Sequence, residues 1–500
     1  MIAQSAVNFS LPYDYYYALY FRFCLTCGAN CSVTRVATKG FAVVVHYQCK
    51  GAEKHDGVWR SSAISNRRYH VNMIISSAFS LCGTGHTVLK SIFECFKCPH
   101  IGKSSYYSIL RTKLYPVIAK KWELVRNTVL NKLKSRESAV TLSGDGHYDS
   151  PGWCAKYCTY IAMDNDTHAI VDFAVVQKKM YTGELEKEGC RELLSGLIQK
   201  GLRIGTFVTD QNDKIGKMIR STDAFKNIKH SLDVWHMAKN LKKKLIKAAK
   251  KSEGLKKWVE PIVTHFWYAC QKCKKDPSLL LQIYHSCLLH LANKHAWNKD
   301  PFADIRGKKP YPVFPNYNKC SHSRILRGSH RRLRGLKWLD MNSDEYKVLY
   351  KIIADTRRSN SMKKCADFVH TGDLEVYHNV RLKYLPKRTA YSLHRMIVMA
   401  MLVGIEVNTN LKKRGQPKSY AQYSKVRAEW VAKPRFKGKD FSFRKDIIDE
   451  MMRVLIDGNP DPVLDDLLRE MGYIVREIPK NIAPIERPAE FSKTNTYSRF

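Results

Sequence analysis

Between residues 137 and 250, the order of apolar and polar positions predicts a sheet followed by alternating helices and strands. Five short runs rich in apolar and β-branched residues have the length of strands. These runs are 139–143, 155–163, 169–177, 203–209 and 227–232. Apolar positions recur at helical spacing in 185–198, 213–225 and 234–246. The order β-β-β-α-β-α-β-α predicts a mixed sheet covered by helices.

The segments on either side of this unit have different patterns. Helical periodicity dominates 61–136 and 234–366, and the chain becomes polar and basic after 408. We therefore expect an α/β fold, in which an RNase H-like mixed sheet is interrupted by an all-α insertion and preceded by a zinc-ribbon-like segment and a helical region. The predicted segments are 1–60 (zinc-ribbon-like), 61–136 (helical N-terminal region), 137–233 (first part of the RNase H-like core), 234–366 (helical insertion), 367–408 (last part of the core, with a third acid) and 409–500 (basic C-terminal tail).

The charge balance of the sequence indicates the kind of partner that the protein binds. Lys and Arg number 85 against 45 Asp and Glu, which gives a formal net charge of +40. The positive charges repel one another unless a polyanion is bound. Nucleic acid is the expected polyanion, because each phosphate that the protein neutralises releases counterions and so increases the affinity. A ribosome-like or membrane-surface basic protein is the alternative. No apolar run is long enough to span a bilayer and no signal peptide is recognisable, so we expect an intracellular protein without a membrane partner.

The 15 cysteines are expected to be reduced core residues or metal ligands rather than disulfides. One Cys-x-x-Cys pair precedes the strand-like stretch 33–45, and a Cys/His pair follows it, which is the arrangement of a zinc ribbon. The candidate zinc ligands are Cys24, Cys27, Cys49 and His55. Cys31 could replace one of them, and a cluster of free core cysteines is the alternative.

Two acids follow apolar strands in this sequence. Asp145 and Asp210 each stand just past such a run, and strands 1 and 4 of an RNase H-like sheet are neighbours, so the two carboxylates would converge. Converging carboxylates repel one another unless a hard cation such as Mg²⁺, or Mn²⁺, lies between them. A third acid, Glu375, follows Thr371 and Asp373, either of which could cap a helix that carries it toward the pair. A turn or capping role is the alternative for each acid alone.

The ordered segments 145–152, 209–210, 233–236 and 370–375 resemble those of animal DDE-type transposases, DNA-transposon proteins related to the Mutator, hAT, P-element and Kolobok groups. The resemblance covers roughly residues 20–410. It implies that Asp145, Asp210 and Glu375 form the catalytic triad, and that a helical insertion precedes the last acid. It also implies that Asp233 and His236 abut the active site.

Two departures from that family's pattern suggest a degenerate or domesticated copy. His147 stands where the relatives have an arginine. Glu406 and Val407 replace an expected Asp-His pair before Asn408.

A basic, aromatic helix face is the candidate DNA contact. Positive side chains can contact phosphates and an aromatic ring can stack on a base. The residues concerned are Trp235, Lys239, Lys242, Lys243 and Lys244. A solvated basic helix face is the alternative.

A further set of histidines and one cysteine lies in the predicted insertion. The residues are His285, His290, His295, Cys320 and His322. They are either a second zinc site or packing and polar residues, and the sequence leaves the choice open.

From these features we expect a transposase-like polynucleotidyl transferase that cleaves and joins double-stranded DNA, transposon ends and target alike, at one two-metal site. It would depend on Mg²⁺ or Mn²⁺, contain structural Zn²⁺, act as a homo-oligomer and work in the nucleus. The basic runs Lys242, Lys243, Lys244 and Lys412, Lys413, Arg414 could serve as import signals. The alternatives are a domesticated, catalytically silent DNA-binding protein and an RNase H-type nuclease.

Overall fold

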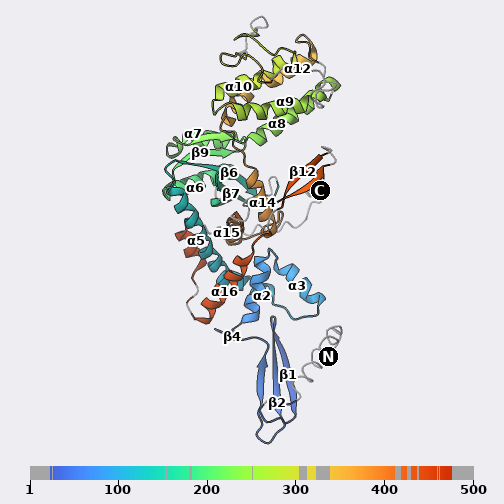
Figure 1. Cartoon of the computed structure of the whole chain (residues 1–500). Helices are drawn as coiled ribbons and strands as arrows, with labels where there is room; N and C mark the ends of the chain where they lie inside the picture. Colours follow the sequence, from blue (N-terminus) through green and yellow to red (C-terminus); the bar gives the residue numbers. More distant parts are fainter. Residues whose placement is uncertain are drawn as a thin grey trace, which may run out of the picture.

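The structure is a computed structural model of the 500-residue chain. It describes residues 23–24, 26–151, 155–178, 183–250, 252–302, 312–322, 338–411, 418–424, 429–435, 438–458, 460, 462–473 and 475. This described part is elongated, with a β-hairpin at one end, a helical lobe at the other and a sheet between them (Figure 1). None of the described helices is long and apolar enough to cross a membrane.

The N-terminal end is an antiparallel sheet in the order β1-β2-β3. Its strands are β1 (Cys31–Lys39), β2 (Ala42–Cys49) and β3 (Gly57–Arg60). A tight turn at Gly40, whose φ is +70°, joins β1 to β2 and returns the chain so that Cys31 pairs with Cys49. Among the described residues, the apolar cluster within this sheet has two buried members, Val43 and Val45. So small a cluster stabilises the three-stranded sheet little, and the sheet needs another source of stability.

Helices connect this end to the central sheet. After a two-residue hairpin of β4 (Ile64–Ser65) and β5 (Arg68–Tyr69), the elements are α2 (His70–Leu81), α3 (His86–Cys95), α4 (Lys103–Ile109), the π-helix η1 (Leu110–Leu114) and α5 (Tyr115–Lys134). The long helix α5 continues along the face of the central sheet, where its Trp122 packs at 5.8 Å, between ring centroids, from Phe173.

The central sheet has five strands in the order β10-β9-β6-β7-β8. The strands are β6 (Val140–Tyr148), β7 (Tyr157–Asp164), β8 (Ile170–Gln177), β9 (Ile204–Thr209) and β10 (Lys229–Leu232). Strand β7 pairs antiparallel with β6 and with β8, β9 runs parallel to β6, and β10 runs parallel to β9. The mixed sheet and the element order predicted from the sequence are therefore both present.

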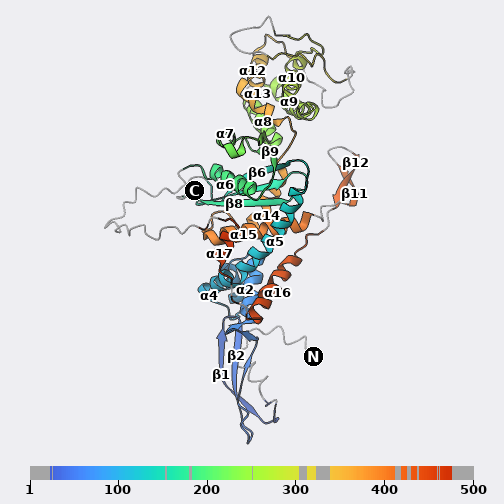
Figure 2. The same cartoon turned by 90° about the vertical axis from the view of Figure 1, so that its left-hand side faces the viewer.

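Helices cover both faces of this sheet (Figure 2). On one face lie α6 (Leu185–Gln199) and α7 (Asp213–Ser221), followed by the short helix η3 (Asp223–Phe225). On the other face lie α5 and α15 (Leu393–Asn410), which is buried along most of its length. Gly404 allows α15 to approach α5 closely, because a Cβ there would lie 2.5 Å from a ring atom of Trp122.

Between β10 and the last part of the core, the regular elements that the structure describes are helices, joined by irregular stretches that include one isolated β-bridge. These helices are α8 (Val234–Ala249), α9 (Glu253–Lys272), α10 (Pro277–His285), α11 (Cys287–Leu291), α12 (Asp344–Ile353), α13 (Thr356–Met362) and η6 (Lys363–Cys365). Their apolar faces form a core of their own that begins at Leu232 and ends at Ala366.

The C-terminal part, which we expected to be a basic tail, contains a hairpin and two helices. After α14 (Gly372–Tyr384) and α15 come the hairpin strands β11 (Lys418–Ser424) and β12 (Glu429–Arg435), then α16 (Ser442–Ile456) and α17 (Leu464–Glu470). Helix α16 packs on α2, with Met451 Sδ 3.2 Å from Ser77 Oγ, so this segment belongs to the core. The hairpin, which stands away from the sheet in both views, was missed because its composition is polar and its aromatic side chains Tyr420, Tyr423 and Trp430 are exposed. The basic run Lys412, Lys413, Arg414 lies outside the described residues.

Candidate active site and zinc cluster

Asp145 lies within β6 between two glycines, and the packing explains both. A Cβ at Gly144 would lie 2.3 Å from Phe207 Cζ, and one at Gly146 would lie 2.6 Å from Glu186 Cγ. Any side chain larger than hydrogen at position 144 or 146 would therefore clash with its neighbour. Asp145 itself is half-buried, and its Oδ1 accepts a hydrogen bond of 2.8 Å from the backbone N–H of Gly146.

The parallel pairing of β6 and β9 brings the two predicted aspartates side by side. Ser143 of β6 pairs with Val208 of β9. Asp145 and Asp210 each follow these paired residues by two positions, so they lie at equivalent places beside one another. Burial raises the pKa of Asp210, and the charge of Asp145 raises it further, as expected for carboxylates that face one another across adjacent strands. Their oxygens are donors that Mg²⁺ and Mn²⁺ prefer, so this pair fits a hard divalent cation.

His236 joins Asp210 to a second, buried carboxylate. Its Nδ1 lies 2.7 Å from Asp210 Oδ1 and 3.2 Å from Asp233 Oδ2, and among the described residues these three form one of the groups with ligand atoms within 4.8 Å of one another. Burial opposes the charge of His236, but the two acids outweigh it and raise its pKa to about 10. The imidazole is therefore a cation that orients Asp210.

Asp233 fixes two helix starts at once. Its Oδ1 accepts hydrogen bonds from the backbone of Trp235 (2.5 Å) and His236 (3.1 Å), which caps α8. Its Oδ2 accepts from the Thr371 backbone N–H at 2.8 Å and from the Thr371 hydroxyl, just before α14. Burial disfavours its charge, but the bonds from His236 and Thr371 prevail and lower its pKa to about 2.

Glu375 lies on the first turn of α14 and is exposed. One turn later, His378 Nε2 lies 2.9 Å from Asp145 Oδ2, so this face of the helix is directed at the first aspartate. Among the described residues, however, neither Glu375 nor Asp145 is part of a group of clustered ligand atoms, whereas Asp210 is. The structure thus brings Asp145 and Asp210 together and places the helix of Glu375 beside Asp145.

His147, which stands in place of an expected arginine, is part of the same contact. Its ring stacks on His378 with the centroids 4.8 Å apart, and its Nδ1 accepts a hydrogen bond of 2.5 Å from Arg381, whose side chain is fully buried. Burial, and then the Arg381 charge, lowers the pKa of His147 to about 2. A neutral histidine therefore packs here, and α14 supplies the buried cation.

Glu186 is a carboxylate of this site that sequence reasoning missed. It lies in the first turn of α6, where the helix dipole alone would favour an acid. In the structure it packs against Gly146, and burial, followed by repulsion from Asp145, raises its pKa to about 7. The glycine after Asp145 was the available signal, because it implies a close neighbour on that face.

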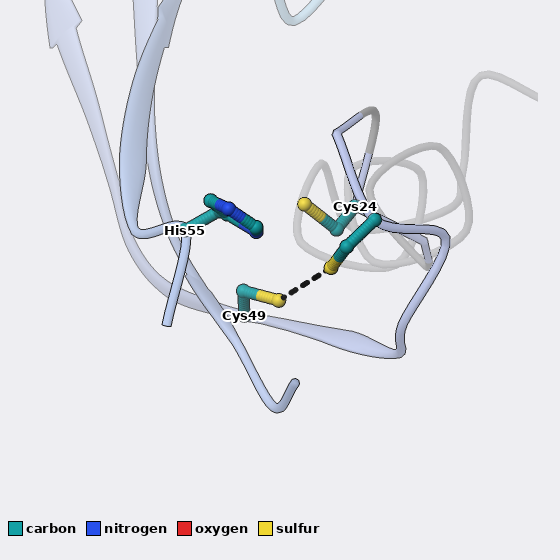
Figure 3. A group of neighbouring side chains, drawn as sticks. Cys24, Cys49 and His55 are labelled. Carbon is teal, nitrogen blue, oxygen red and sulfur yellow. Dashed lines mark hydrogen bonds between the residues drawn. The ribbon is translucent and has the colours of Figure 1, made fainter. Parts of the chain in front are cut away.

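The four predicted zinc ligands come together at the open end of the first hairpin. Cys24 and Cys27 precede β1, Cys49 ends β2 and His55 follows, and their ligand atoms all lie within 4.8 Å of one another. The side chains of Cys24, Cys49 and His55 point toward a common centre (Figure 3). Cys31 is not a member of this group.

Local contacts in this cluster fit a zinc ion. The Cys27 and Cys49 sulfurs are 3.5 Å apart, close to the spacing of thiolates around tetrahedral zinc. Backbone N–H groups of Cys27 and Thr26 lower the pKa of Cys24 to about 6, which favours its thiolate. His55 Nδ1 is buried without a hydrogen-bond partner among the described atoms, while Nε2 contacts Glu53 at 3.1 Å. The four residues named from the sequence therefore form a possible metal-binding cluster.

The candidate DNA-contact residues lie on α8, which begins next to Asp233. Trp235 is partly exposed, and Lys239 Nζ lies 4.4 Å from the centre of its ring. Lys243 and Lys244 are exposed, whereas Lys242 is partly buried and pairs with Glu260. Because Trp235 precedes His236 in the chain, this basic face starts at the carboxylate site.

A comparison with known families assigns the chain. The family model of Mutator-like transposases matches residues 22–325. The matched range includes the zinc cluster, Asp145, Asp210 and most of the insertion, and it ends before Glu375. None of the curated proteins matches the sequence significantly. Since the family match covers more than half of the 500 residues, the chain belongs to the Mutator-like transposase family.

Proposed function

We propose that this protein is a metal-dependent polynucleotidyl transferase that cleaves and joins double-stranded DNA. Its family is that of transposases, which implies DNA binding and a divalent metal. The observation that carries the proposal is the placement of Asp145 and Asp210 at neighbouring positions of two paired parallel strands. The strand order β10-β9-β6-β7-β8 supports an RNase H-like core.

In this proposal, Asp145, Asp210 and Glu375 would hold Mg²⁺ or Mn²⁺. Bound there, the metal activates a water molecule or a 3′-hydroxyl and stabilises the leaving oxygen of a phosphodiester. His236 and His378 orient Asp210 and Asp145 through contacts of 2.7 Å and 2.9 Å.

Asp233 and Glu186 support the same site from two sides. Asp233 fixes Thr371 and so the start of the helix that carries Glu375. Glu186 adds negative charge beside Asp145, which strengthens the attraction of this site for a divalent cation.

The face formed by Trp235, Lys239, Lys243 and Lys244 would guide DNA to the carboxylates. Cations on α8 can contact the phosphates, and the partly exposed indole can stack on an unpaired base near the cleavage point. Such an enzyme would act in the nucleus. It would also act as a homo-oligomer, because joining two transposon ends requires two copies of the site.

The test is metal-dependent nicking of duplex DNA by the full-length protein. Asp145→Asn, Asp210→Asn and Glu375→Gln each keep the side-chain shape and remove one charge, so we expect cleavage to fall to background while DNA binding persists. Asp373→Asn is the matched control, since Asp373 lies on the same turn but pairs with His168 at 2.8 Å.

Three outcomes would contradict the proposal. Cleavage that survives Asp145→Asn would show that the nuclease activity arises elsewhere. A wild-type protein that binds DNA but never cleaves it with Mg²⁺ or Mn²⁺ would instead indicate a domesticated, silent DNA-binding protein. Preferential cleavage of RNA–DNA hybrids would indicate an RNase H-type nuclease.

A further inference from the structure

The helical insertion contains a second group of metal-ligating side chains. One nitrogen or sulfur atom from each of four residues lies within 4.8 Å of the corresponding atoms of the others. The residues are His290, His295, Cys320 and His322. His285, the remaining candidate from the sequence, is buried outside this group, and its Nε2 contacts Ser359 Oγ at 3.0 Å.

The spacing in this group suits tetrahedral zinc. Bonds of about 2.0–2.1 Å to nitrogen and about 2.3 Å to sulfur place neighbouring ligand atoms about 3.3–3.6 Å apart. Cys320 Sγ lies 3.6 Å from His290 Nδ1. The three imidazole rings are 4.8, 5.1 and 5.3 Å apart between centroids, with planes 82–88° to one another. The rings therefore converge edge to face instead of stacking.

His295 carries the second sign of a ligand. Its Nε2 lies 3.1 Å from the side-chain oxygen of Asn293, while its Nδ1 is buried and has no hydrogen-bond partner among the described atoms. A histidine that binds a metal through one nitrogen commonly directs the other to an oxygen acceptor. A buried Nδ1 without a hydrogen-bond partner is unfavourable, and a metal bond would remove that penalty.

The backbone holds the two halves of the group together. His295 follows α11, and its carbonyl accepts a hydrogen bond of 2.9 Å from the N–H of Cys320. A β-bridge between Ala296 and Lys319 extends this pairing by one step. The ring of Trp338 packs 5.7 Å from the His295 ring and covers one side of the group.

We propose that His290, His295, Cys320 and His322 bind one zinc ion that fixes the loop after α11 to the segment ending at residue 322. Four protein ligands fill a tetrahedral shell and leave no position for substrate, so the site would be structural.

Zinc content per chain tests the proposal on the full-length protein. Cys49→Ser first removes a ligand of the N-terminal cluster, so that one site is left to count. In this background we expect one zinc per chain by mass spectrometry. Adding His322→Ala, at an exposed position that should not disturb folding, is expected to reduce the content to near zero. Ser321→Ala is the matched control, because it lies between two ligands and offers none.

Cobalt substitution gives an independent readout. In the Cys49→Ser background, Co²⁺ should produce the visible bands of a tetrahedral site and thiolate charge transfer, and Cys320→Ser should abolish the charge transfer. Circular dichroism would establish that each variant is folded. A Cys49→Ser protein that holds neither zinc nor tetrahedral cobalt, or a His322→Ala variant that keeps a full equivalent of zinc, would overturn the proposal.

Discussion

Replacing Gly144 by alanine tests how the fold positions the first aspartate. The added Cβ would lie 2.3 Å from Phe207 Cζ and 2.9 Å from Tyr160 Cε1, and both rings are fully buried. The first distance is about 1.2 Å shorter than an ordinary carbon–carbon contact of about 3.5 Å. Overpacking of this kind costs about 1–3 kcal/mol, and alanine regains about 0.5–1 kcal/mol of strand propensity. We expect a net loss of about 2 kcal/mol.

Urea unfolding followed by tryptophan fluorescence measures this loss. With a slope of about 2 kcal/mol per molar urea, the midpoint should fall by about 1 M. Gly196→Ala is the control, because only Lys200 Nζ, at 3.7 Å, lies near its new methyl group, and the helix α6 should be stabilised slightly. Phe207→Leu removes the clashing atom, so the double variant with Gly144→Ala should be at least about 1 kcal/mol more stable than additivity predicts. Additive losses, or equal stability of the two alanine variants, would refute the packing argument.

Three further predictions concern charge and metal. Asp172→Asn should cost about 3 kcal/mol in urea unfolding, because buried Arg126, 3.5 Å from Asp172, would lose its charged partner; a loss under about 1 kcal/mol would contradict this. Burial, together with neighbouring carboxylates, raises the pKa of Glu186 to about 7 from an ordinary 4.5, so folded-state stability should fall as pH rises between these values. Glu186→Gln should flatten that slope and be the more stable protein above pH 7, and an unchanged slope would count against it. Cys49→Ser should release one zinc and lower the thermal midpoint, whereas Cys31→Ser should do neither, as zinc analysis and calorimetry would show.

The central sheet could be predicted because each of its strands is marked locally. Apolar runs of strand length alternate with helical periodicity, and turn residues separate them. The placement of Asp145 beside Asp210 also followed, since neighbouring parallel strands bring equivalent positions together. The hairpin β11–β12 did not follow, because its strands are mostly polar, its aromatic side chains are exposed, and it buries little.

Contacts between distant segments lay beyond the sequence pattern. Whether Glu186 faces solvent or Asp145 depends on the rotation of α6 over the sheet, which a helical period does not fix. The same holds for His285 and His290, five residues apart: one is directed at Ser359 and the other at Cys320. The spacing of Cys and His residues along the chain indicated two candidate groups. The packing of the chain decides which residues belong to each group.

The two ends of the helical insertion meet at one buried carboxylate. Asp233 caps the first helix of the insertion and binds Thr371, where the chain returns, and the Val234 N–H donates to the Val369 carbonyl at 3.2 Å. The chain thus leaves the sheet and returns to it at adjacent positions beside Asp233. A lobe attached in this manner can be lengthened, shortened or exchanged over evolution without shifting the strands beneath it, because its attachment points stay adjacent whatever lies between them.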